Sequence, residues 1–93
     1  MRTTDIALSV KRLVKFEGSG ALRAFCDLAV GDLVLIKGMR VFEGKKGLFV
    51  SMPRHQGKDT KWYDVVESLT DEFKDEASRI VLEAYQREID ANL

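Results

Sequence analysis

Cysteine and histidine are common both in catalytic nucleophile–base pairs and as transition-metal ligands, and this chain has one of each, Cys26 and His55. Because a structural zinc site takes about four such ligands and a catalytic one about three, the sequence predicts no metal centre and no cofactor. A Cys26–His55 pair is conceivable, but Cys26 alternates with Ala24 and Leu28 on the apolar side of a predicted strand, where thiols are usually structural. No phosphate-cradling loop of the Walker or dinucleotide type occurs. We therefore expect neither an enzyme nor a small-molecule substrate.

The basic side chains offer a different chemistry, the binding of a polyanion. Fifteen basic and fifteen acidic residues balance over the chain, but positions 37–61 carry seven basic against two acidic, and positions 62–93 carry three against nine. Long cationic side chains on exposed loops suit contacts with nucleic-acid phosphates. Trp62 is able to stack on a base, or to anchor a core or an interface. The candidate binding residues are Lys45, Lys46, Arg54, His55, Lys58 and Lys61.

Two alternatives stay open for these charges. Clustered cations also arise on an ordinary solvated surface, so the count alone does not identify a partner. A dimeric protein-interaction module without direct nucleic-acid binding is the competing function, because the total charge is balanced and the C-terminal third is acidic. Salt-dependent nucleic-acid binding separates the two hypotheses.

Alternating apolar and polar residues predict five strands that position these candidates. The first two, over 5–13 and 21–30, form a hairpin around the glycine-rich turn 17–20, and Gly31–Asp32 turns the chain into a third strand, Leu33–Phe42, in which Gly38 marks a bulge. A turn at 43–47 leads to a short strand, Leu48–Met52, which Pro53 ends. Residues 54–61 lack apolar side chains and are predicted as a solvated loop before a fifth strand, Trp62–Val66. The predicted core-facing residues are Ile6, Leu8 and Val10 in the first strand, and Leu22, Ala24, Cys26, Leu28 and Val30 in the second.

The last third changes to a helical period. Ser68 or Thr70 is placed to cap the helix, and Asp71 and Glu72 complement the positive end of its dipole. Favourable pairs four residues apart are expected for Asp75 with Arg79 and for Glu83 with Arg87. The predicted apolar stripe consists of Phe73, Ala77, Ile80, Val81, Ala84 and Tyr85.

These elements predict an α+β fold: a five-stranded antiparallel β-sheet followed by one C-terminal amphipathic α-helix, in a single domain over 1–93. The single cysteine and the short apolar runs favour a cytoplasmic location without membrane association. A domain of this size has a modest core, so we expect a homodimer that buries more surface.

The stretch Arg40–Pro53, RVFEGKKGLFVSMP, resembles the central signature of the SpoVG family, in which an R-V-x-E/D-G turn leads into G-L-F-V-x-M-P and a basic loop. Thr4–Ile6 is similar to that family's opening T-D-V, and Trp62–Val65 lies where the family has an aromatic-x-D-I. Two departures occur. The usual S-K-R-T after the proline is replaced by RHQG at 54–57, and Val66–Ser68 lacks the usual proline.

The resemblance implies a five-stranded antiparallel sheet with a C-terminal helix, a dimer built through sheet residues, and site-selective DNA and RNA binding that regulates gene expression in sporulation, septation or cell division. In family members the basic loop after M-P and the neighbouring helix are implicated in nucleic-acid contact. By position, this implies contacts from Arg54, Lys58 and Lys61, with His55 and Gln56 nearby. Lys45 and Lys46 are candidates on charge alone.

Overall fold

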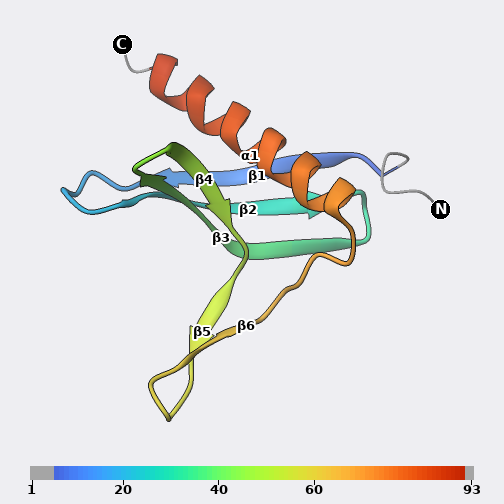
Figure 1. The fold of residues 1–93 in the computed structure, drawn as a ribbon. Helices are drawn as coiled ribbons and strands as arrows, with labels where there is room; N and C mark the ends of the chain where they lie inside the picture. Colours follow the sequence, from blue (N-terminus) through green and yellow to red (C-terminus); the bar gives the residue numbers. More distant parts are fainter. Residues whose placement is uncertain (1–5, 92–93) are drawn as a thin grey trace.

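The computed structural model describes residues 6–91, which form six strands and one helix (Figure 1). The first four strands make an antiparallel sheet in the order β1-β2-β3-β4, the last two make a separate hairpin, and α1 lies across one face of the larger sheet. The predicted α+β class is confirmed. The element bounds are β1 Leu8–Lys15, β2 Leu22–Val30, β3 Val34–Gly44, β4 Gly47–Ser51, β5 Arg54–Gln56, β6 Trp62–Asp64 and α1 Asp71–Ala91.

The predicted glycine positions shape the sheet. Gly31 starts the turn between β2 and β3 with a φ of 56°, in the left-handed region that side-chain-bearing residues rarely adopt. Gly38 has a φ of 85° and lies where the β2–β3 register shifts between Cys26 and Asp27. The predicted bulge at Gly38 is therefore confirmed.

The first and fifth strands differ from their predicted forms. β1 begins at Leu8 and continues to Lys15, and an irregularity between Val10 and Arg12 shifts the alternation partway along the strand. Asp5, the predicted start of the strand, and Thr4 of the family-like opening lie outside the described residues. The Trp62 strand pairs with β5 in its own hairpin and does not join the main sheet as a fifth strand.

The core lies between α1 and the sheet. The predicted helix stripe is confirmed, since Ala77, Val81 and Tyr85 are buried and Phe73 and Ile80 pack against the same cluster. The sheet contributes alternate residues of its two interior strands, which point toward α1 and exclude water from this face. These sheet residues are Ala24, Cys26 and Leu28 from β2 and Met39 and Val41 from β3.

Thr70, the second of the two predicted caps, caps the helix. Its Oγ1 accepts a hydrogen bond from the Phe73 backbone N–H at 3.0 Å, while the Ser68 hydroxyl donates to the Thr70 carbonyl at 2.7 Å. The cap satisfies one of the backbone N–H groups that the first turn leaves without a helical partner.

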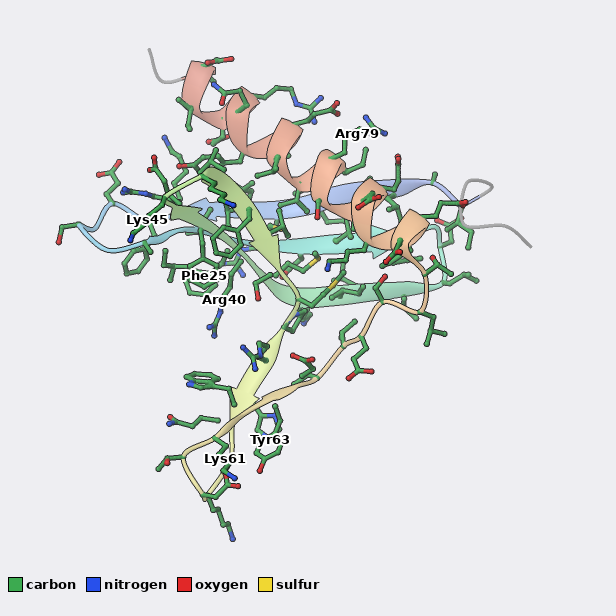
Figure 2. The ribbon with its side chains drawn as sticks, viewed as in Figure 1. Phe25, Arg40, Lys45, Lys61, Tyr63 and Arg79 are labelled. Carbon is green, nitrogen blue, oxygen red and sulfur yellow. The ribbon has the colours of Figure 1, made fainter. Side chains whose placement is uncertain are left out.

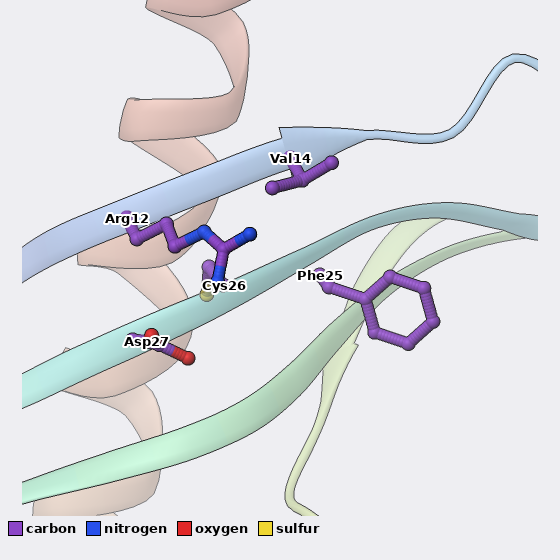
Figure 3. A pocket seen from close by; sticks show the side chains of 5 residues that line it. All are labelled: Arg12, Val14, Phe25, Cys26 and Asp27. Carbon is purple, nitrogen blue, oxygen red and sulfur yellow. The ribbon is translucent and has the colours of Figure 1, made fainter.

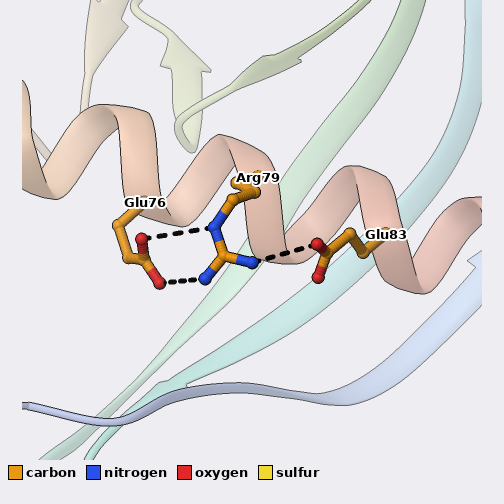
Figure 4. Close-up of polar contacts among 3 residues, drawn as sticks. All are labelled: Glu76, Arg79 and Glu83. Carbon is orange, nitrogen blue, oxygen red and sulfur yellow. Dashed lines mark hydrogen bonds and ion pairs between the residues drawn. The ribbon is translucent and has the colours of Figure 1, made fainter.

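Arg79 on the outer face of α1 pairs differently from the prediction. Its guanidinium donates to both carboxylate oxygens of Glu76 and to Glu83 Oε1 at 2.9 Å, in place of the predicted Asp75 (Figure 4). A glutamate side chain is longer than that of aspartate, so Glu76 reaches the guanidinium of Arg79 three residues later in the chain. Glu83 then pairs with Arg79 and not with Arg87. Within residues 6–91, no helix is both long and apolar enough to cross a membrane.

Candidate nucleic-acid interface

A two-stranded arm, β5–β6, extends from the sheet and carries four of the six candidate residues (Figure 1). Arg54 pairs with Asp64 across the arm, and their side chains form an ion pair at 3.0 Å. The prediction of a loop over 54–61 was therefore wrong for Arg54–Gln56. These residues are all exposed, so they lack the apolar alternation that marks a strand, and backbone pairing with β6 defines them instead.

The tip of the arm is an ordered turn. The Gly57 N–H donates to the Lys61 carbonyl at 2.8 Å, and the Thr60 N–H donates to the Gly57 carbonyl at 3.0 Å. Asp59 accepts from the Lys61 backbone N–H at 3.1 Å and from the Tyr63 hydroxyl. A Cβ on Gly57 would come within 2.8 Å of the Tyr63 ring, so any larger residue here would displace the Tyr63 side chain.

Asp59 moderates the positive charge of the tip. The Tyr63 hydroxyl, with help from the Lys61 backbone N–H, lowers the pKa of Asp59, and the same hydrogen bond raises the pKa of Tyr63. Asp59 is therefore a carboxylate at neutral pH and lies between Lys58 and Lys61 in the sequence. With two lysines and one aspartate, the tip keeps a net positive charge of one.

The structure divides the predicted candidates into two groups. Lys45 and Lys46 form the turn between β3 and β4, whereas Lys58 and Lys61 lie at the tip of the arm (Figure 2). Residues 47–56 between the two groups span up to about 30 Å of extended chain. Among residues 6–91, these four lysines have no ion-pair partner, in contrast to Arg54. One compact basic patch does not form within a single copy of the chain.

The two residues considered for catalysis occupy different environments. Cys26 is buried in the core, and burial, with a smaller effect of the charge on Asp27, raises the pKa of its thiol to about 11. His55 is exposed on β5, with its ring centroid 6.2 Å from that of Tyr63. Among the described residues, no three or more His, Cys, Asp or Glu side chains are grouped so as to hold a metal ion.

The sheet face opposite α1 carries a group of residues that the sequence analysis did not assemble. Strand pairing aligns Val14, Phe25, Arg40 and Ser51 in one row across β1 to β4. Figure 2 shows Phe25 and Arg40 on the side of the sheet away from the helix. We call the residues of this side that carry rings, together with Arg40, the aromatic–arginine face: Phe16, Phe25, Arg40, Phe42, Phe49 and Trp62.

Ring contacts hold the aromatic–arginine face together. Phe42 stacks on Phe49 with centroids 5.5 Å apart, and Phe16 meets Phe25 edge-on at 6.2 Å. The guanidinium carbon of Arg40 lies 5.6 Å from the Phe25 ring centroid and 5.9 Å from that of Trp62. Trp62 belongs to the arm, so Arg40 links the arm to the sheet through cation–π contacts.

Arg40 is short of polar partners. Its Nε is buried and donates no hydrogen bond to an acceptor of the described residues, and its guanidinium forms none of the ion pairs within residues 6–91. By contrast, Arg23 on the same side pairs with Glu43 at 3.1 Å. A guanidinium without a carboxylate beside it remains available for an external anion.

Two hollows adjoin Arg40 and its neighbours. One, of about 360 Å³, is lined by Arg40, Phe42, Phe49, Ser51, Arg54 and Trp62, so it joins the sheet to the base of the arm. The other lies over β1 and β2 and is lined by Arg12, Val14, Phe25, Cys26 and Asp27 (Figure 3). Both hollows are lined by ring and cationic side chains, and the second also by the carboxylate of Asp27.

The sequence alone does not reveal this face, because its residues come from strands that are far apart in the chain. The alternation in β2 places Phe25 opposite the core side, and the spacing of Arg40 and Phe42 places both on one side of β3. These signals were available, but no local pattern predicts that β2 and β3 pair with Phe25 beside Arg40, or that the arm brings Trp62 to Arg40. The candidate cations were therefore identified without the rings that accompany them.

The fold and its surface define a class of protein, a small α+β domain in which a helix covers one sheet face and the other face carries aromatic and cationic side chains beside a basic arm. The chain belongs to the SpoVG family, whose family model matches residues 1–87.

Relatives that share most of their length with this chain carry the name "Putative septation protein SpoVG". The protein from Archaeoglobus fulgidus is 36% identical over 77 residues, which cover 83% of this chain and 91% of the relative. The protein from Lachnospira eligens is 31% identical over 87 residues, covering 94% and 93%. The protein from Agathobacter rectalis is 29% identical over 90 residues, covering 97% and 98%.

Proposed function

We propose that this chain is a nucleic-acid-binding regulatory protein of the SpoVG type, which binds DNA, RNA or both and acts in gene regulation linked to sporulation or septation. Membership of the family and the septation names of its relatives support the link to septation. The observation that carries the first is a set of cations without ion-pair partners among residues 6–91, on the arm tip, on the β3–β4 turn and at Arg40. The proposed activity is binding and not catalysis.

The distribution of charge supports one direction of approach. The acidic helix lies against the sheet face opposite Arg40, and even its Arg79 is occupied by two carboxylates. A polyanion is repelled from the helix side and attracted to the arm and the aromatic–arginine face. We therefore propose that nucleic acid binds on the side of the sheet away from α1.

Removing the arm cations tests this proposal. The R54A/K58A/K61A variant should bind labelled duplex DNA and RNA more weakly, and the slope of log K against log salt should become shallower by about 0.9 for each duplex phosphate that the variant no longer neutralises. The measurement is fluorescence anisotropy at several salt concentrations.

The matched control is K74A/R79A/R87A, which removes the same number of positive charges from α1. Because net charge changes equally in both variants, a shallower slope in the arm variant alone indicates local contact. Equal slopes in wild type and the arm variant would exclude the arm from the interface. Binding without salt dependence, or no binding at all by wild type, would contradict the proposed function.

A second candidate function is a protein-interaction module. Leu33, Val34 and Leu35, at the turn into β3, are all exposed, and Leu33 exposes 69% of its surface. A cluster of exposed apolar side chains favours a protein contact. Affinity capture before and after nuclease treatment separates the two functions, because a partner bridged by nucleic acid is lost and a direct protein partner is kept.

We also propose that the chain forms a homodimer. β1 and β4 are the edge strands of the main sheet, and the free side of an edge strand is a template for pairing with a second copy. Light scattering should then give twice the chain mass of 10.5 kDa. A monomer mass at all concentrations tested would contradict this assembly.

A further inference from the structure

The rings of the aromatic–arginine face are accessible as flat surfaces. Phe16 and Phe49 each expose 51% of their surface and Trp62 exposes 49%, although rings of this kind are usually covered in a core. They come from the end of β1, from the edge strand β4 and from the arm, and they surround the more buried Phe25 and Phe42. The solvent-facing side of a sheet usually carries polar side chains, so several exposed rings on one such side indicate a binding surface.

A cation lies among these rings. Arg40 contacts both Phe25 and Trp62 and is on an interior strand, in the middle of the row that crosses the sheet. Two carboxylates near this face are paired with other arginines, since Glu43 binds Arg23 at 3.1 Å and Asp64 binds Arg54 at 3.0 Å, while Asp27 lies beside Phe25 and accepts from the Gly38 N–H at 3.4 Å. The ligand that fits must therefore offer an anion to Arg40 and flat groups to the rings.

From these features we infer that the aromatic–arginine face binds unpaired nucleotides, with bases stacked on Phe49 and Trp62 and a phosphate at Arg40. This inference rests on the proposed function and specifies its ligand as single-stranded nucleic acid. In a duplex the base faces stack on one another and only their edges are accessible, whereas a single strand presents both bases and phosphates. A sheet without a projecting helix on this side suits the single strand.

A second copy of the chain fits this face less well. Two copies stacked across a twofold axis at Arg40 would bring together two guanidinium groups that form no ion pair within residues 6–91, and like charges repel. The homodimer proposed above uses edge strands and leaves this face open.

The test compares oligonucleotides that share phosphates and differ in bases. Wild-type protein is titrated with a labelled 15-nucleotide oligothymidylate and with an abasic oligonucleotide of equal length at one salt concentration. Stacking of one or more bases should make the intact strand bind about tenfold or more tightly. Trp62 is the only tryptophan, so its emission should be quenched by the intact strand and not by the abasic one.

Phe49→Ala should remove most of the preference for the intact strand, and Leu48→Ala, the neighbour on the same strand facing the other side, should preserve it. The wild-type comparison does not depend on either variant folding.

Equal affinities for the two strands, with unchanged Trp62 emission, would overturn this inference while the proposed function stands. A Trp62 emission that shifts only as a dimer dissociates would overturn it in favour of a second copy, and failure of both strands and of duplex to bind would overturn both proposals.

Discussion

At the residue scale, the environment of Cys26 determines what its thiol can do. The side chain is 2% exposed, and burial is the main reason that its pKa rises to about 11. At neutral pH it is therefore a protonated packing group and a poor nucleophile. His55, the only histidine of the chain, lies on the exposed arm.

We predict that Cys26 reacts slowly with a thiol-specific reagent at pH 8 in the folded protein and rapidly in denaturant. The folded pKa lies above the unfolded value, so the stability contribution of the thiol is complete below about pH 9 and is lost as the pH rises toward about 11. The loss amounts to roughly 2–3 kcal/mol at its full extent. Denaturant unfolding across this pH range measures it.

Cys26→Ala is the control, because it should remove this part of the pH dependence. Fast labelling of the native wild-type protein at pH 8, without unfolding, would show that the thiol is accessible and would contradict the prediction.

At the element scale, the arm and the helix are each stabilised by short-range polar contacts. The arm turn depends on Asp59 and on the close approach of Tyr63 to Gly57. The helix start depends on Thr70, whose hydroxyl accepts the Phe73 N–H. Neither the arm turn nor the helix cap is part of the core. The first positions the lysines of the arm tip, and the second fixes the start of the acidic helix.

Thr70→Ala should lower the free energy of unfolding by about 1 kcal/mol, because it removes the N-cap of the only helix in residues 6–91. Thermal or denaturant unfolding followed by circular dichroism measures the change. Thr70→Ser keeps the hydroxyl and should preserve most of the wild-type stability. If both variants lose the same amount, the cap hydrogen bond is not the cause.

At the scale of the whole molecule, two faces of one sheet have opposite roles. The face toward α1 is fully apolar at Ala24, Leu28 and Met39, whereas the opposite face keeps Arg40 and several rings accessible. Packing on the first face supplies the stability that lets the second remain uncovered.

Leu28→Ala should reduce stability by about 2–5 kcal/mol, because Leu28 is completely buried between β2 and α1 and its loss leaves a cavity. Leu33→Ala is the matched control, since Leu33 is 69% exposed, and should change stability by less than about 0.5 kcal/mol. Denaturant unfolding of the two variants gives both values. Similar losses in the two would mean that Leu28 is not part of a close-packed core.

Much of the fold was predictable because the signals are local. Periodicity alone located the buried stripe at Ala77, Val81 and Tyr85, and glycine chemistry located the bulge at Gly38. Lys45 and Lys46 were placed correctly in a turn by their flanking glycines. β5 was missed because its three residues are all exposed and carry no period.

The amino-acid sequence by itself determined the helix, the two sides of the second strand, and the residues that carry positive charge. Only the tertiary structure decided that Phe25 lies beside Arg40, that Trp62 reaches Arg40 from the arm, and that the lysines divide into two groups. The physical reason is that side-chain periodicity depends on neighbours along the chain, while strand pairing depends on contacts between segments far apart in it.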